Sequence, residues 1–221
     1  MMDIQGAIFD MDGSLVDSLS GWIDIWKGIS DRFLDGKPFL PEPEVDKKIR
    51  TMLLSDAILY IHEVCGIGQS GKELLDYTNE ILRDFYKHRV PLKPGVMAYM
   101  EYLKEKGVKM CIASATDLPL VHLAVESCGI GTFLSDIISC TEVGKGKEEP
   151  DVFFAAQKRL GTPLEQTWVF EDSYTALKTA HHAGFHTVGV YDALSYHQKE
   201  IAETADVYIA KNETMEKLMR E

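Results

Sequence analysis

The residues that decide the fold are Ile8-Phe9-Asp10-Met11-Asp12-Gly13-Ser14-Leu15-Val16-Asp17-Ser18. The apolar run at positions 6–9 is typical of a short buried strand, and it ends at the carboxylates of Asp10 and Asp12. Strand periodicity puts these two on one side, and Gly13 lets the backbone turn sharply just after them. Converging carboxylates repel one another, so we expect a cation there. Because the ligands are oxygens, Mg²⁺ is favoured over zinc. The alternative is an Asp-rich turn, and we expect Asp17 or Ser18 to cap the next helix in either case.

The composition is that of a globular protein. The chain has 221 residues, 45% of them hydrophobic and 26% charged, enough for one large domain or a core with a modest insert. The net charge of −12 disfavours binding to nucleic acid or to an anionic membrane. An anionic substrate therefore needs a local positive site, made of a metal, a lysine and backbone N–H groups.

The ends and the cysteines bear on localisation. The start Met1-Met2-Asp3-Ile4 runs directly into the first strand, which leaves no room for a signal peptide. No apolar run approaches the roughly 18 residues that a membrane helix needs. The four cysteines lack CxxC spacing, and we expect reduced, buried thiols in a cytoplasmic protein. They are Cys65, Cys111, Cys128 and Cys140.

Helical patterns alone follow the first strand. The apolar spacing predicts helices over 19–33, 45–53, 55–65 and 72–88. Pro91, Pro94 and Gly95 punctuate the end of this segment. We therefore expect an all-helical insert, joined to the rest of the chain near residues 17–19 and 91–95.

Helices and short β runs alternate from residue 96 onward. The predicted helices cover 96–106, 118–128, 152–160, 174–183, 198–203 and 214–219. The predicted strands cover 108–113, 136–140, 167–170, 186–190 and 207–209. This alternation favours a parallel sheet covered on both faces, with ligands at the carboxyl ends of the strands. The predicted fold is α/β, with a Rossmann-like core of residues 1–18 and 91–221 and a small all-helical cap domain of residues 19–90.

Three further groups of polar residues follow predicted strands. Ser114 and Thr116 can hold a phosphate oxygen or merely cap a helix. Lys145 and Lys147 lie in a glycine-containing loop, where a lysine is most often solvated. A carboxylate that attacks a phosphate dianion, however, needs a fixed cation nearby.

Glu171 and Asp172 follow the predicted strand 167–170. Adjacent side chains on a strand point to opposite faces, so one of the two is expected to reach a site directly and the other through water. Either could instead cap the following helix.

The opening stretch resembles the nucleophile motif DxDGxLxDS of the haloacid dehalogenase-like hydrolase superfamily and matches it at every named position. This resemblance implies that Asp10 is the nucleophile and that Asp12 is the general acid/base. It also implies a helical cap between the first and second motifs, where the predicted insert lies.

The other motifs of the family extend this assignment. The second implies Ser114, above Thr116, as a phosphate-binding hydroxyl beside Ala115, with Met11 between the two acids. The third resembles GKPxPD and implies Lys147 as the phosphate-binding lysine, with Lys145 in reserve. Here Glu148 replaces its first proline.

The fourth motif implies Asp172 as a direct Mg²⁺ ligand and Glu171 as a close or outer-shell acid. The Mg²⁺ set is then completed by Asp10 and by the backbone carbonyl of Asp12.

The predicted function is a Mg²⁺-dependent phosphatase that hydrolyses a small phosphorylated metabolite through an aspartyl-phosphate, as a monomer. Dehalogenase chemistry needs no acid at the position of Asp12, so the presence of Asp12 argues against it. A β-phosphoglucomutase-like mutase is an alternative, but the resemblance implies a cap histidine where this chain has Trp22. Phosphonate hydrolysis would need a cap lysine, for which Lys27 and Lys47 are the candidates. A non-catalytic phosphate-binding module is the remaining alternative.

Other conspicuous side chains are expected to play no part in the chemistry. His181, His182 and His186 are assigned a structural or solvated role. Trp22 and Trp26 are assigned to the cap core or its interface. Lys47, Arg50 and Arg89 could anchor a second anionic group, although solvated surface is favoured for each.

Overall fold

The computed structural model describes residues 3–18, 20–49, 52–193 and 195–220. Six parallel strands form one sheet in the order β3-β2-β1-β4-β5-β6. Their bounds are β1 Gly6–Phe9, β2 Lys109–Ser114, β3 Asp136–Ser139, β4 Thr167–Glu171, β5 His186–Val190 and β6 Val207–Ile209. The predicted α/β fold is confirmed.

The helices fall into two groups along the chain. Four follow β1 directly: α1 Gly21–Phe33, α2 Pro43–Ile49, α3 Leu54–Cys65 and α4 Gly71–His88. The others are α5 Val96–Glu105, α6 Leu118–Ser127, α7 Cys140–Val143, α8 Asp151–Leu160, α9 Tyr174–His182 and α10 Gln198–Thr204. Short 3₁₀ helices are η1 Gly131–Phe133, η2 Leu164–Gln166 and η3 Met215–Arg220.

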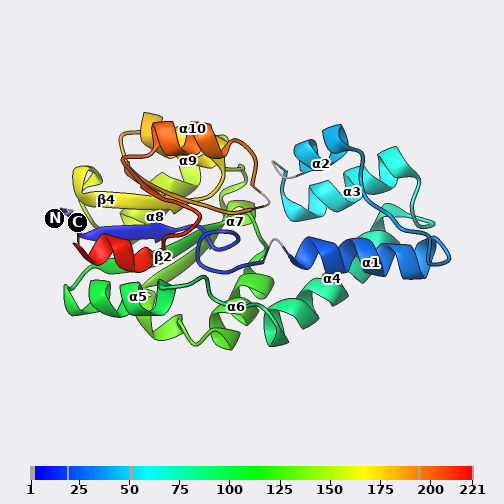
Figure 1. Cartoon of the computed structure of the whole chain (residues 1–221), viewed down its shortest axis with the longest axis horizontal. Coiled ribbons are helices and arrows are strands. Elements are labelled where there is room, and N and C mark those ends of the chain that lie inside the picture. The colour runs from blue at the N-terminus through cyan, green and yellow to red at the C-terminus, as the bar shows by residue number, and fades with distance from the viewer. Residues whose placement is uncertain (1–2, 19, 50–51, 194, 221) are drawn as a thin grey trace.

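Side chains of β1 alternate between two apolar layers. Ala7 and Phe9 pack into the cluster that includes residues of α5 and α6, whereas Ile8 packs into a second cluster with residues of α8 and α9. This burial on both faces is what an all-parallel sheet requires. Helices α9 and α10 lie on one side of the sheet in Figure 1, and α5 and α6 lie on the other.

Helices α1–α4 form a lobe at one end of the molecule (Figure 1). Two chain segments link this lobe to the sheet, and they pair with each other. Val16 forms an antiparallel bridge with Leu92, and the amide of Asp17 donates to the carbonyl of Pro91 at 3.0 Å. The helical insert after β1 is therefore confirmed, while its assignment as a separate domain of residues 19–90 remains a prediction.

Several local predictions are wrong. Neither Asp17 nor Ser18 caps α1. The N-cap is Ser20, which already has helical dihedral angles and makes no capping bond with its side chain. The segment predicted as the helix 214–219 is the 3₁₀ helix η3, and the short helix α7 was not predicted.

The cysteines are free thiols, as predicted, but they are not all buried. Cys111 and Cys140 are buried, Cys128 is half-buried, and Cys65 is exposed, because it is the last residue of α3 and lies beyond the last buried turn of that helix. Among the described residues, no helix has both the length and the apolar character needed to cross a membrane.

Candidate active site

The candidate site lies where the loops after β1, β2 and β4 meet, at the carboxyl edge of the sheet. Strand β1 pairs with β2 on one side and with β4 on the other. Such a switch in strand order is where ligands bind in open α/β sheets. A cavity of about 730 Å³ opens there between the sheet and helices α1–α4.

Three carboxylates converge at the floor of the cavity. Asp10, Glu171 and Asp172 each offer an oxygen, and these oxygens lie within 4.8 Å of one another. All three residues are buried, with exposures of 7%, 1% and 5%. The alignment of β1 with β4 creates this proximity, because the amide of Asp10 donates to the carbonyl of Phe170 at 2.9 Å.

Gly13 lets the turn after β1 approach the end of β4. Its φ is +85°, and a Cβ at this position would collide with the carboxylate of Asp172. Any other residue would therefore strain the backbone and also displace an acid of the cluster. Glycine in the opening motif is required by both the conformation and the close approach.

Which of the two adjacent acids would reach a bound ion directly, and which through water, stays a prediction. Both Glu171 and Asp172 have an oxygen in the cluster. Glu171 is the last residue of β4, so Asp172 lies beyond the strand and the alternation rule no longer applies to it.

The electrostatics of the cluster favour a bound cation. Burial, opposed by Lys147 and reinforced by Glu171, raises the pKa of Asp10 well above its usual value. Burial and the charge of Glu171 raise the pKa of Asp172 to about 7. Like charges in a desolvated site raise carboxylate pKa values in this way. A divalent cation would offset this repulsion, and the buried oxygen donors match the preference of Mg²⁺.

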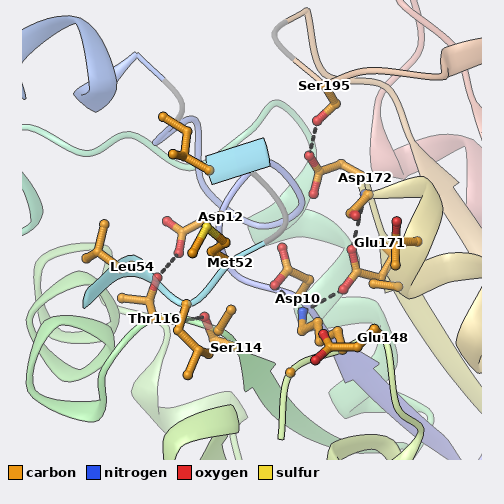
Figure 2. Close-up of a pocket in the computed structure, with 18 of the residues that line it drawn as sticks. Asp10, Asp12, Met52, Leu54, Ser114, Thr116, Glu148, Glu171, Asp172 and Ser195 are labelled. Atoms are coloured by element: carbon orange, nitrogen blue, oxygen red, sulfur yellow. Dashed lines mark hydrogen bonds and ion pairs between the residues drawn. The ribbon is translucent and has the colours of Figure 1, made fainter. Parts of the chain in front are cut away.

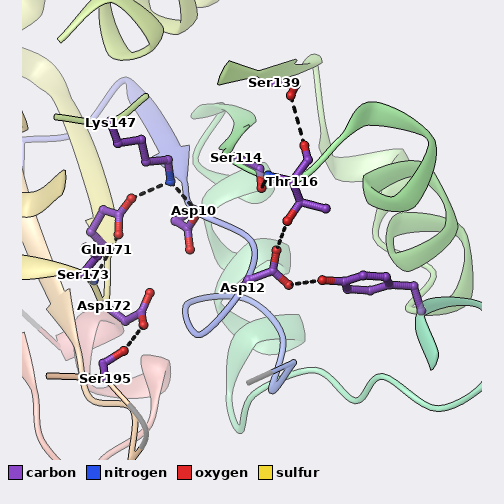
Figure 3. Close-up of polar contacts among 11 residues, drawn as sticks. Asp10, Asp12, Ser114, Thr116, Ser139, Lys147, Glu171, Asp172, Ser173 and Ser195 are labelled. Atoms are coloured by element: carbon purple, nitrogen blue, oxygen red, sulfur yellow. Dashed lines mark hydrogen bonds and ion pairs between the residues drawn. The ribbon is translucent and has the colours of Figure 1, made fainter. Parts of the chain in front are cut away.

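Lys147 supplies one positive charge to the cluster (Figure 3). Its ammonium forms ion pairs with Asp10 Oδ1 and with Glu171 Oε1, the latter at 2.5 Å. Burial lowers the pKa of Lys147, but these carboxylates more than compensate and raise it above the usual value. Lys145 instead pairs with Asp151 at 3.0 Å, away from the cluster. Glu148 is exposed at the cavity wall.

Asp12 is separated from the cluster by the direction of its side chain. Its Oδ2 accepts a hydrogen bond from Thr116 Oγ1 at 2.8 Å, and its Oδ1 accepts one from Tyr86 Oη at 2.8 Å. Figure 3 shows this carboxylate directed toward Thr116, away from Asp172. Thus Asp12 has no carboxylate oxygen in the metal cluster, and only its backbone carbonyl remains as the predicted metal ligand.

The predicted phosphate-binding groups are also brought to the cavity. Ser114 is buried at the end of β2, and its Oγ accepts the amide hydrogen of Thr116 at 3.0 Å. Ala115 also lines the cavity. Met11 has its side chain in the apolar core, so only its backbone is available to a ligand.

Two residues of the site had no signal in the sequence. Tyr86, on α4, donates to Asp12 across 74 residues. Ser195, in the loop after β5, donates to Asp172 through its hydroxyl (Figures 2 and 3). Neither belongs to a recognisable motif, so only the tertiary structure identifies them.

Residues assigned no chemistry lie mostly outside the cluster. His181, His182 and His186 contribute no atom to the acidic group, which is the one candidate metal cluster among the described residues. Trp26 is buried and packs against Trp22 with the two rings tilted by 31°, and Trp22 itself lines the cavity.

The candidate distal anchors differ from one another. Arg89 pairs with Asp24 and Asp84. Lys47 is exposed, as predicted, but it also lines the cavity. Arg50 lies outside the described residues, and Lys27 is exposed and does not line the cavity.

Comparison with known proteins assigns the family. The model of the haloacid dehalogenase-like hydrolases matches residues 4–184. The chain is 22% identical to a phosphorylated carbohydrates phosphatase of Thermotoga maritima, with 99% of each chain covered. It is 23% identical to hexitol phosphatase A of Escherichia coli, with coverage of 86% and 84%.

A solved structure shares the fold. The β-phosphoglucomutase of Clostridium difficile superposes with a TM-score of 0.76 at 15% identity, covering 98% of this chain and 96% of the other. The chain belongs to the haloacid dehalogenase-like hydrolase family. The individual roles assigned to Asp10, Asp12, Ser114, Lys147, Glu171 and Asp172 remain predictions.

Proposed function

We propose that the protein is a Mg²⁺-dependent phosphatase of small phosphomonoesters that acts through a phosphorylated Asp10. The observation that carries this proposal is the buried group of Asp10, Glu171 and Asp172, with oxygens within 4.8 Å of one another and Lys147 in contact. The names of the two relatives, a phosphorylated carbohydrates phosphatase and a hexitol phosphatase, support a phosphorylated metabolite as the substrate.

The first half of the proposed reaction transfers the phosphoryl group to the protein. A carboxylate oxygen of Asp10 attacks phosphorus, and the bond from phosphorus to the alcohol oxygen breaks. Asp12 gives a proton to that oxygen, so a neutral alcohol leaves. Ser114 and Lys147 hold the non-transferring phosphate oxygens in line for the attack.

The second half regenerates the protein. Asp12, now ionised, takes a proton from water as the water oxygen attacks phosphorus, and the bond between phosphorus and Asp10 breaks to release inorganic phosphate. Asp10, Asp172 and the carbonyl of Asp12 would hold Mg²⁺, with Glu171 close by. When bound, the ion supplies positive charge that stabilises the negative charge of the transferring phosphoryl group.

The two alternatives, a mutase and a non-catalytic module, would need different side chains in the cap and around Asp12. A mutase needs a group that transfers protons in the cap, and Trp22, which lines the cavity, cannot do so. A non-catalytic module would need neither the nucleophile nor the hydrogen bonds that orient Asp12.

The test is Mg²⁺-dependent release of phosphate from p-nitrophenyl phosphate. We expect Asp10→Asn to abolish turnover. Asp31→Asn, the same change at an exposed position of α1, should leave it unchanged. Undiminished turnover in Asp10→Asn would refute the role of Asp10 as the nucleophile. A lack of turnover in the unmodified protein across a panel of phosphate esters would favour the binding module. Isomerisation of a hexose phosphate faster than phosphate release would favour the mutase.

A further inference from the structure

The cavity has two chemically different sides. The acids, Lys147 and Ser114 form a polar floor beneath it. Helices α1–α4 and the segment before α3 provide an opposite wall that is mostly apolar, and we call it the cap wall. Its apolar members are Trp22, Ile49, Met52, Leu53, Leu54 and Leu82. Figure 2 labels Met52 and Leu54 on the side of the cavity where Asp12 and Thr116 lie.

Most polar groups of the cap wall are already bonded or lie at the mouth. The hydroxyl of Tyr86 donates a hydrogen bond to Asp12. Lys47 and Asp56 line the cavity, but both are exposed to solvent. Among the described residues, the indole N–H of Trp22 is then the one side-chain donor left on the inner part of this wall, fewer than the several hydroxyls of a polyol would need.

Most polar groups on the third side of the cavity, formed by the loop after β5, are also bonded within the protein. Ser195 donates its hydroxyl to Asp172. Tyr196 donates its hydroxyl to Asp46 at 2.8 Å, which joins this loop to α2. His197 lies 3.3 Å from Glu200.

These surroundings determine which alcohol the cavity can hold. A sugar or polyol phosphate carries a hydroxyl on nearly every carbon. Each hydroxyl that is buried without a partner loses its hydrogen bonds to water, which opposes binding. An alkyl or aryl group instead gains from burial against apolar side chains. The cap wall thus favours the apolar group and penalises the polyol.

We propose that the substrate is a phosphomonoester whose alcohol part is predominantly apolar. This inference rests on the proposed phosphatase function and narrows its substrate class. It distinguishes the chain from the two relatives described above, whose names specify phosphorylated carbohydrates and a hexitol.

The test compares esters that differ only in their hydroxyl groups. We would measure kcat/KM for n-hexyl phosphate against hexitol 6-phosphate, and for n-propyl phosphate against glycerol 3-phosphate, with Mg²⁺ present. All four are esters of primary alcohols. The polyols are the more acidic leaving groups, so intrinsic reactivity opposes the expected result. We expect the alkyl ester of the hexyl pair to be preferred by at least about tenfold.

A matched pair of variants locates the preference in the cap wall. Leu54→Asn places an amide in the cavity with the same number and branching of side-chain heavy atoms, and it should reduce the hexyl preference by at least about threefold. Leu59→Asn makes the same change in the same helix at a residue that is 41% exposed and does not line the cavity. It should leave the preference unchanged. Met52→Gln is a second variant in case Leu54→Asn does not fold.

The outcomes separate this inference from the function on which it rests. If p-nitrophenyl phosphate is hydrolysed in an Asp10-dependent way but the polyol esters are preferred or equal, the substrate class is wrong and the phosphatase stands. If the alkyl preference is unaffected by both cavity variants, the cap wall is not its origin and the inference fails. If no ester is hydrolysed, both proposals fail.

Discussion

Asp12 differs from Asp10 and Asp172 in that each of its two carboxylate oxygens accepts a hydrogen bond from a neutral side chain. Thr116 holds one oxygen from the sheet side, and Tyr86 holds the other from α4. The proposed acid/base is therefore positioned jointly by the α/β core and by the helical insert. Tyr86 is buried, and its proximity to Asp12 adds to the effect of burial in raising the pKa of the phenol, so it remains a hydrogen-bond donor at neutral pH.

The Tyr86→Phe variant tests this arrangement. Asp12 would lose one of its two donors and with it a fixed orientation, so we expect kcat to fall about tenfold, the equivalent of one hydrogen bond, with little change in KM. Tyr77→Phe is the matched control, because Tyr77 lies on the same helix and packs its ring against Phe33. Equal kcat values for Tyr86→Phe and the unmodified protein would contradict the positioning role.

Lys147 is expected to matter for stability as well as for activity. Lys147→Met would keep the volume but leave Asp10 and Glu171 buried without their cation. Removal of one partner from a buried ion pair typically costs about 3–5 kcal/mol. Urea unfolding in the absence of divalent ions should reveal this loss. Lys145→Met, which removes an exposed pair with Asp151, should change little; equal stability losses in the two variants would show that burial of the Lys147 pairs is not what matters.

At the scale of elements, the turn after β1 determines whether the acids can meet. The register of β1 against β4 places Asp10 beside Glu171. The positive φ of Gly13 then folds the chain back against Asp172. The metal cluster depends on this turn as much as on the identity of its carboxylates.

Two glycine variants separate backbone strain from steric collision. Gly13→Ala and Gly36→Ala both place a Cβ at positive φ, but only the first meets other atoms, since nothing lies within 4 Å of the Cβ at Gly36. Strain alone costs roughly 1–2 kcal/mol in either case. We expect Gly13→Ala to lose Mg²⁺-dependent activity as well, and Gly36→Ala to keep it. Retained activity in Gly13→Ala would show that Asp172 tolerates displacement.

At the scale of the whole molecule, the sequence predicts the architecture well because its signals are local. The apolar runs of the strands and the glycines that end the helices lie within a few residues of the boundaries they specify. The 3₁₀ form of η3 and the exposure of Cys65 could not be predicted in the same way, since hydrophobic periodicity does not distinguish one helix type from another or show which turn faces solvent.

The candidate site is predictable where its residues follow strands or, as for Lys147, match a motif of the family. Asp10, Ser114 and Asp172 lie at or just beyond strand ends that the parallel sheet brings to one edge. Tyr86 and Ser195 come from a helix and a loop whose placement depends on the packing of the whole chain. No motif in the sequence around Tyr86 or Ser195 identifies either residue as part of the site.

The most direct measurement of the proposed mechanism is the location of a phosphoryl group during turnover. The protein would be mixed with Mg²⁺ and a phosphate ester, quenched in acid, digested and analysed by mass spectrometry. We predict one phosphoryl group on the peptide that contains Asp10, absent from Asp10→Asn and increased in Asp12→Asn if phosphoenzyme hydrolysis slows more than its formation. Turnover with no phosphorylated peptide, or with the group on another residue, would contradict catalysis through an aspartyl-phosphate at Asp10.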